Sequence, residues 1–201
     1  DETRLQRMSL FSDLATESVA EIAGGGWMLG HNRGNRIISR GEYLEGLYTV
    51  FEGRLKLYML SCGGDERVLR ILQPGDTFGE AIMFNAFPSP VFVDALTAGR
   101  LGYLPRELIS DALIRLPGFM DAMLAGMSTL MRNLIQDLET ACLQNAVQRT
   151  VSYLLREAEN SPPPYVALTL PAPKAVIASM LNMSAETFSR ELNVFFRGFA
   201  A

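Results

Sequence analysis

Residues 46–76 read GLYTVFEGRLKLYMLSCGGDERVLRILQPGD, and this stretch decides the fold class. Short apolar runs in it are separated by Glu52-Gly53, by Cys62-Gly63-Gly64-Asp65 and by Pro74-Gly75-Asp76, which are typical turn sequences. The same succession of short strands and glycine-containing turns extends outward to Trp27 on one side and to Leu104 on the other. This succession predicts an antiparallel β-barrel or sandwich.

Helical periodicity flanks this β region on both sides. The expected helices cover residues 2–7, 16–23, 106–115, 119–143 and 145–159. Ser12 and Asp13 are candidate caps for the second helix, Gly24-Gly25-Gly26 ends it, and Pro117-Gly118 separates the third helix from the fourth. A short strand is expected over Tyr165–Leu170. The chain is therefore expected to belong to the α+β class.

The helix expected over residues 119–143 carries an apolar seam with alternating spacings of four and three. Its members are Met120, Leu124, Met127, Met131, Leu134, Leu138 and Ala141. Such a heptad seam is typical of helix pairing. A second stripe, Met123, Leu130 and Ile135, would pack on the barrel of the same chain, and two apolar faces need two surfaces to bury them. We therefore expect a homodimer, and the alternative is a helix that lies on one core without a partner.

Residues 175–192 have the pattern of two helices joined by a short turn at Asn182-Met183, with Ser184 as N-cap of the second. Apolar side chains that would pack the pair together are Val176, Ile177, Leu181, Phe188 and Leu192. Glu186, Ser189 and Arg190 would then face outward, where Arg suits guanine and Glu accepts from the amino group of cytosine. The alternative is an ordinary helical hairpin with solvated polar residues.

Composition restricts the possible functions. The net charge of −4 and the pI of about 5.1 count against non-specific nucleic-acid binding, so a DNA contact must rest on local residues. Two cysteines are too few for a disulfide framework, and His31 alone cannot supply the two or three histidines of a catalytic barrel metal site, so we expect no enzyme. No apolar run reaches the roughly 18 residues of a membrane helix, and Asp1-Glu2-Thr3-Arg4 does not resemble a signal peptide, so a cytoplasmic protein is expected.

Several stretches together resemble the CRP/FNR family of bacterial transcription regulators. Residues 184–190, SAETFSR, look like its recognition helix, residues 46–58 are similar to its central strands, and residues 75–80, GDTFGE, match the start of its effector-binding cassette. The resemblance covers nearly the whole chain. It implies a jelly-roll, cyclic-nucleotide-binding-like sensor domain over residues 1–118, a dimerisation helix over 119–143 and a helix-turn-helix DNA-binding domain over 144–201. The family's β-hairpin wing is expected to be missing, because residues 194–201 are too few to form it.

The resemblance also implies a DNA site and partners. The spacing of Glu186, Ser189 and Arg190 is similar to that of the FNR branch, which implies a palindromic operator with TTGA-like half-sites and RNA polymerase as a further partner. Ser184 and Thr187 are expected to contact the DNA as well. Alternative functions are a cyclic-nucleotide-binding regulator, or a ligand-binding module that does not bind DNA.

The resemblance also bears on the effector that the sensor domain would bind. The resemblance places an effector pocket at Gly79, Glu80, Ala81, Pro90 and Val91. Family members that bind cyclic nucleotides have an Arg-Ser pair where this chain has Pro90-Val91, so cAMP and cGMP are disfavoured. The N-terminal cysteine cluster that would hold an iron–sulfur cluster is absent from this sequence. Residues 78–84 resemble the nitric-oxide-responsive, Dnr-like branch, whose members are thought to use haem, and His31 is then the candidate haem ligand.

Overall fold

The computed structural model describes residues 2–85, 87–159 and 169–198. The chain divides into two compact units. The first unit holds residues 1–59 and 70–131, and the second holds residues 60–69 together with the chain from Arg132 onward. Each unit is described by itself below.

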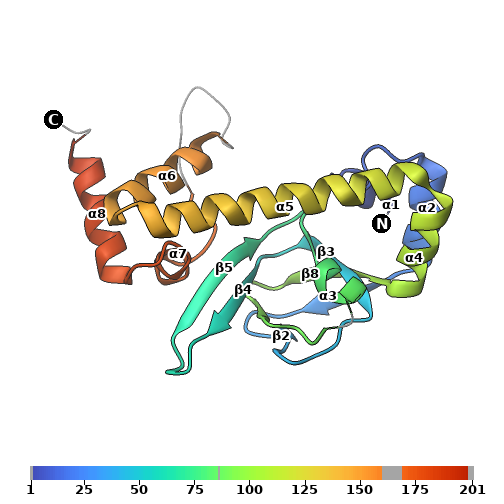
Figure 1. The fold of residues 1–201 in the computed structure, drawn as a ribbon, viewed down its shortest axis with the longest axis horizontal. Coiled ribbons are helices and arrows are strands. Elements are labelled where there is room, and N and C mark those ends of the chain that lie inside the picture. The colour runs from blue at the N-terminus through green and yellow to red at the C-terminus, as the bar shows by residue number, and fades with distance from the viewer. Residues whose placement is uncertain (1, 86, 160–168, 199–201) are drawn as a thin grey trace. The chain divides into compact units, whose positions relative to one another are not determined.

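The strands in the described part of the chain form two antiparallel sheets in the order of a jelly roll (Figure 1). The strands are β1 (Trp27–His31), β2 (Arg36–Ile38), β3 (Gly46–Glu52), β4 (Leu55–Leu60), β5 (Glu66–Leu72), β6 (Thr77–Phe78), β7 (Phe92–Ala95) and β8 (Gly99–Pro105). One sheet has the order β1-β8-β3-β6, and the other has the order β2-β7-β4-β5. The predicted antiparallel jelly roll is confirmed, although the strands form two sheets of four and no closed barrel.

Alternation along the strands separates two cores in the first unit. Val50 of β3 and Leu101 of β8 belong to the apolar cluster that includes Leu55, Leu72 and Val93 of the second sheet. Residues an odd number of positions away from Val50 and Leu101 along β3 and β8 point to the other face of the first sheet. Leu47, Phe51 and Leu104 there belong to a second cluster, which is shared with the helices.

The helices of the first unit complete this second cluster. They are α1 (Glu2–Gln6), α2 (Thr16–Gly24), α3 (Glu80–Asn85), α4 (Arg106–Arg115) and the start of α5 (Pro117–Leu143). Leu5 of α1, Ile22 of α2, Ile109 of α4 and Phe119 of α5 are all buried in it. Among the helices that the structure describes, none combines the length and apolar character needed to cross a membrane.

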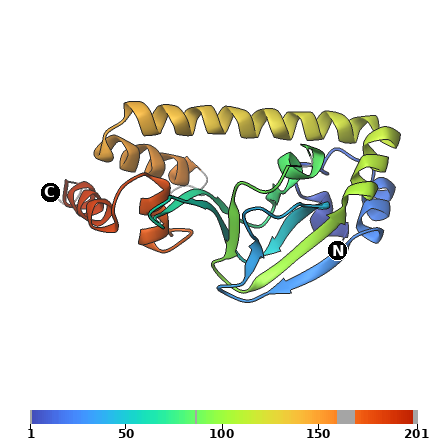
Figure 2. The ribbon, with the colours of Figure 1, turned by 60° about the horizontal axis from the view of Figure 1, so that its bottom comes forward.

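Two details of these helices differ from the prediction. The N-cap of α2 is Ala15 and makes no side-chain hydrogen bond, whereas Ser12 hydrogen-bonds the carbonyl of Ser9 and the carboxylate of Asp13 instead. Helix α5 begins at Pro117, where a break was expected. Figure 2 shows the chain turning sharply between α4 and the long helix α5. Proline is tolerated at the first helical position, because the amide proton that it lacks has no partner there. Helix α3 was not predicted at all.

The second unit holds the part of α5 from Arg132 onward together with the helices α6 (Ala146–Glu159), α7 (Lys174–Met180) and α8 (Ala185–Gly198). Asn145 and Gln148 begin α6 with a reciprocal pair of hydrogen bonds, each side-chain oxygen accepting from the other residue's backbone N–H at 3.0 Å. The buried apolar side chains of α6, α7, the C-cap of α7 and α8 are Tyr153, Leu154, Ile177, Ala178, Leu181, Phe188 and Leu192. Most of the strand expected over Tyr165–Leu170 lies outside the described residues.

The end of the β4–β5 hairpin also belongs to the second unit. The Ser179 hydroxyl of α7 donates to the carbonyl of Glu66 at 2.7 Å and accepts from the backbone N–H of Val68 at 3.0 Å. The Arg67 guanidinium donates to the carbonyl of Ser179 at 2.8 Å. These three bonds attach the hairpin to the carboxyl end of α7.

Candidate DNA-reading helix and effector pocket

The turn between α7 and α8 has a defined geometry. Met183 N–H donates to the carbonyl of Ala178 at 3.0 Å, and Asn182 N–H donates to that of Ser179 at 3.2 Å. This pair of bonds is a Schellman motif, in which the residue after the C-cap adopts a left-handed conformation. Asn182 occupies that position with φ of 56°, which asparagine tolerates better than most residues. The turn therefore sets the direction in which α8 leaves α7.

Ser184 begins α8 in the predicted way. Its hydroxyl accepts from the backbone N–H of Thr187 at 3.1 Å, and its carbonyl accepts from Phe188 N–H at 3.0 Å. The same hydroxyl donates to the Thr187 side chain at 3.1 Å. The hydroxyls of Ser184 and Thr187 are thus hydrogen-bonded to each other at the start of α8. The free backbone N–H groups at a helix start favour an anion such as a phosphate.

Helix α8 has one buried and one open face. Phe188 and Leu192 are buried, and the Phe188 ring meets the Tyr153 ring edge to face with centroids 6.4 Å apart. Glu186 and Arg190 lie on the exposed face, and Ser189 is half-buried beside them. Hydrogen bonds from its own backbone N–H and from Ser184 hold the pKa of Glu186 below its usual value, so it is a carboxylate at neutral pH.

Arg190 already has an ionic partner in its neighbour Glu191. Its Nε and Nη2 donate to Glu191 Oε1 at 3.2 and 3.1 Å. The Arg190 side chain is 67% exposed, whereas that of Glu191 is 11% exposed. The Arg190 guanidinium is therefore accessible to an incoming molecule. The largely buried Glu191 carboxylate holds it in place through the two hydrogen bonds.

The predicted effector cassette contains a buried acid. Gly79 has φ of 101°, a conformation that favours glycine, and it leads directly into α3. Glu80, the first residue of α3, is buried, and its Oε2 has no hydrogen-bond partner among the described residues. Burial raises the pKa of Glu80, and the nearby charge of Arg70 opposes this rise in part. Arg70 is itself paired with Asp76.

The other cassette residues offer no charge. Pro90 and Ala81 are exposed, and Val91 is buried. Ser89, which the sequence did not mark, is buried, and its hydroxyl donates to the carbonyl of Val91 at 2.8 Å. Its backbone is bound to Gly41 and Glu42. Because this hydroxyl is already used by the backbone, it does not replace the missing Arg-Ser pair as a phosphate clamp.

The heptad residues of α5 are exposed along the helix, except for Ala141, which is half-buried. Met131, Leu134 and Leu138 are exposed by 62, 54 and 64% of their surfaces. Met123, from the second predicted stripe, is buried in the helix-side core, whereas Ile135 of the same stripe is exposed. Helix α5 thus offers a long apolar seam that the described residues of the chain leave open.

His31 lies at the end of β1 and is buried. Both ring nitrogens are shielded and have no hydrogen-bond partner among the described residues. Iron would need one of these nitrogens exposed, so the residues as they stand do not fit a haem at His31. Within the described part of the chain, no group of three or more His, Cys, Asp or Glu is placed to hold a metal ion.

Comparisons with known proteins match both units. A family model described as a cyclic nucleotide-binding domain matches residues 31–115, and one described as a Crp-like helix-turn-helix domain matches residues 148–197. The CRP-like cAMP-activated global transcriptional regulator of Mycobacterium tuberculosis is 22% identical over 94% of this chain and 85% of its own length.

Solved structures agree with these matches. FixK2 from Bradyrhizobium japonicum superposes with a TM-score of 0.75 at 20% identity, over 86% of this chain and 85% of that one. DNR from Pseudomonas aeruginosa superposes with a TM-score of 0.56 at 27% identity, over 96% and 85% of the two chains. The similarity to FixK2 concerns the fold, whereas the similarity to DNR extends to the sequence.

Proposed function

Since this chain is a transcription regulator of the CRP/FNR type, with a cyclic nucleotide-binding domain and a Crp-like helix-turn-helix, we propose that it acts as a homodimer on a two-fold symmetric operator. In this proposal residues 1–118 sense an effector, residues 119–143 dimerise, and residues 144–201 bind DNA. The protein works in the cytoplasm, where it meets the DNA and RNA polymerase.

One observation carries the DNA proposal. The first turns of α8 hold Glu186 and Arg190 on the open face, while Phe188 and Leu192 fix the opposite face in the core. Arg190 would donate two hydrogen bonds to guanine, and Glu186 would accept from cytosine. Ser184 and Thr187 lie at the helix start, where we assign them to the phosphate backbone. Ser189 completes the set of base-reading residues.

The dimer proposal rests on the exposed seam of α5. An apolar stripe of this length is stable in water when a second helix covers it, and the heptad spacing fits a second copy of α5. Two copies would present two α8 helices to successive major grooves about one DNA turn apart. The operator is accordingly a palindrome, for which we propose TTGA-like half-sites.

The effector proposal concerns Gly79, Glu80, Ala81, Pro90 and Val91. A cyclic nucleotide would bring a phosphate to positions 90 and 91, where Pro90 and Val91 carry no charge and the Ser89 hydroxyl is already bonded to the backbone, so we propose an effector other than cAMP or cGMP. The unpartnered Oε2 of Glu80 would accept a hydrogen bond from this effector. Effector binding would shift the populations of two arrangements of α5 and so re-aim the reading helices.

A mobility-shift assay tests the core of the proposal. The full chain is titrated against a duplex with a TTGA-type palindrome and against the same duplex with both half-sites scrambled. We expect saturable binding to the palindrome at a concentration well below that for the scrambled duplex. Equal binding of the two duplexes would contradict sequence-specific recognition, and titrations with cAMP and with haem address the effector.

A further inference from the structure

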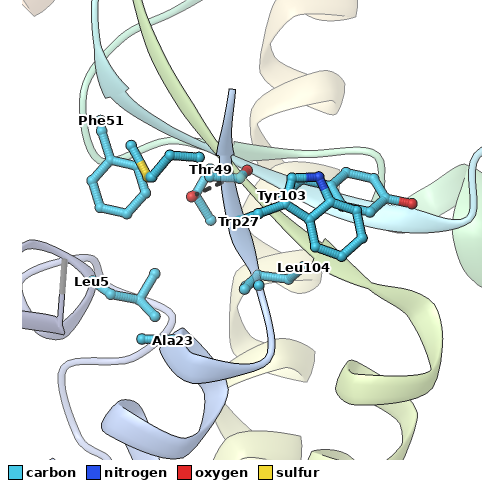
Figure 3. A pocket seen from close by; sticks show the side chains of 10 residues that line it. Leu5, Ala23, Trp27, Thr49, Phe51, Tyr103 and Leu104 are labelled. Atoms are coloured by element: carbon cyan, nitrogen blue, oxygen red, sulfur yellow. Dashed lines mark hydrogen bonds between the residues drawn. The ribbon is translucent and has the colours of Figure 1, made fainter. Parts of the chain in front are cut away.

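A pocket of about 170 Å³ lies in the first unit, between the first sheet and helices α1 and α2 (Figure 3). Its lining residues are Leu5, Ala23, Gly26, Trp27, Met28, Thr49, Phe51, Gly102, Tyr103 and Leu104. None of them belongs to the cassette around Glu80. In Figure 3, Leu5 and Ala23 lie across the pocket from Phe51, and Trp27 lies beside Tyr103.

Gly102 lets two lining side chains approach the sheet closely. In the strand register Gly102 of β8 lies between Met28 of β1 and Thr49 of β3. A Cβ at position 102 would lie 2.5 Å from both the Phe51 ring and the Thr49 hydroxyl. Glycine therefore lets the Phe51 ring and the Thr49 hydroxyl lie directly over the β8 backbone, in the space that a larger residue would occupy, and both side chains line the pocket.

The chemistry of the walls limits what can bind. None of the lining residues is charged, and the Thr49 hydroxyl at the floor is directed to the carbonyl of Gly102. The rings of Trp27, Phe51 and Tyr103 and the thioether of Met28 favour contact with another aromatic ring. An apolar cavity of about 150 Å³ is known to hold one benzene ring, so the volume suits a single ring.

Ion pairs hold the wall formed by α1. Arg4 of α1 donates to Glu52 of β3 at 2.6 Å, and Arg100 of β8 donates to the same carboxylate at 2.6 and 2.9 Å. Leu5, the next residue after Arg4, is thereby kept at the pocket. The Glu52 carboxylate thus connects α1 to β3 and β8 beside the pocket.

We propose that this pocket is a second ligand site of the first unit, for a neutral aromatic molecule of one ring. The proposal does not depend on DNA binding or on the cassette. Trp27 supplies a local reporter, because it is the single tryptophan of the sequence, is 53% exposed and packs on Tyr103 with ring centroids 4.8 Å apart.

The test uses 4-fluorotoluene as the probe. The full chain is titrated while the ¹⁹F resonance of the probe and the Trp27 emission, excited at the red edge of the tryptophan band, are recorded. We expect both signals to saturate with the same dissociation constant. Absence of saturation in both signals would overturn the proposal.

Matched variants locate the site. Ala23→Leu fills the pocket from α2 and is expected to weaken binding at least tenfold, whereas Ala20→Leu, the same change one turn earlier and outside the lining, leaves the dissociation constant within twofold. Circular dichroism verifies that both variants are folded. 4-Fluorobenzoate should bind at least tenfold more weakly than the neutral probe. A folded Ala23→Leu variant that binds like the parent, or equal binding of the benzoate, would refute the assignment.

Discussion

Ser184 caps the start of α8, the proposed reading helix, because both its hydroxyl and its carbonyl accept hydrogen bonds from the first turn. Its hydroxyl satisfies the Thr187 N–H, one of the amide groups that a helix start leaves without an intrahelical partner. Ser184→Ala removes this bond and should lower the free energy of unfolding by about 1 kcal/mol, whereas Ser184→Asp should retain most of the stability. Urea unfolding followed by circular dichroism measures both, and equal loss in the two variants would show that the cap is not responsible.

Arg190 is the residue whose loss should be most specific. Arg190→Ala removes a bidentate donor and is expected to cost about 1–3 kcal/mol of operator binding, concentrated at one base position of each half-site. Arg33→Ala, in the exposed loop after β1, is the matched control and should bind like the parent. Operators substituted at each position in turn give the measurement. An Arg190→Ala variant with unchanged affinity would remove this residue from the reading set.

Glu80 gives a pH prediction. Burial raises its pKa in the folded chain above the ordinary value of 4.5, so the native state holds the proton more tightly than the unfolded state. Its contribution to stability is then complete below pH 4.5 and is lost as pH rises through the folded pKa. Glu80→Gln removes this loss, so the variant should gain stability relative to the parent as pH rises from 4 to 8. Denaturant midpoints across this range decide the sign, with Glu17→Gln on α2 as the exposed control.

At the level of elements, α5 combines a buried and an open stretch. Phe119 and Met123 pack into the first unit, while the seam residues beyond them are exposed. Leu138→Glu places a charge in the seam and should turn the proposed dimer into a monomer in sedimentation velocity. Thr129→Glu adds the same charge at an exposed position outside the seam and should leave the dimer intact. A Leu138→Glu protein that sediments as a tight dimer would refute the seam.

The elements that the sequence predicted well are those with a local signal. The hairpin at Cys62-Gly63-Gly64-Asp65, the heptad helix and Ser184 at the start of α8 depend on residues close together in the chain. Helix α3 was missed because six residues are too few for a clear period. The pocket was missed for a different reason: Gly102 meets Met28 and Thr49 only through the strand register, which no local pattern reveals.

In the candidate site, too, the features with a local sequence signal were predicted, and those that depend on distant segments were not. Phe188 and Leu192 were expected to face the core and do so, which leaves Glu186 and Arg190 outward. The pairing of Arg190 with Glu191 and the burial of Glu80 and Ser89 depend on packing from distant segments. The sequence therefore predicted which face of α8 is exposed, but not the electrostatic state of the cassette.

For the whole molecule, charge has a consequence for selectivity. The sequence has a net charge of −4, so its overall field opposes the approach of a polyanion. We expect that at about 150 mM salt, random-sequence duplex is not retained at protein concentrations that fully shift the operator. Competition with excess random duplex measures this ratio. If random DNA competed as well as unlabelled operator, binding would be governed by charge and not by base contacts.

The pairing of Arg190 with Glu191 would influence base choice by the proposed reading helix, α8. Before any duplex arrives, the Arg190 guanidinium is already satisfied by its own chain. A guanine, with two acceptors side by side, can replace that carboxylate as the partner, whereas a base with a single acceptor there offers less than Arg190 would give up. If Arg190 reads a base as we propose, rejection of wrong sequences would be assisted from within the protein, by an acid that need not touch the DNA.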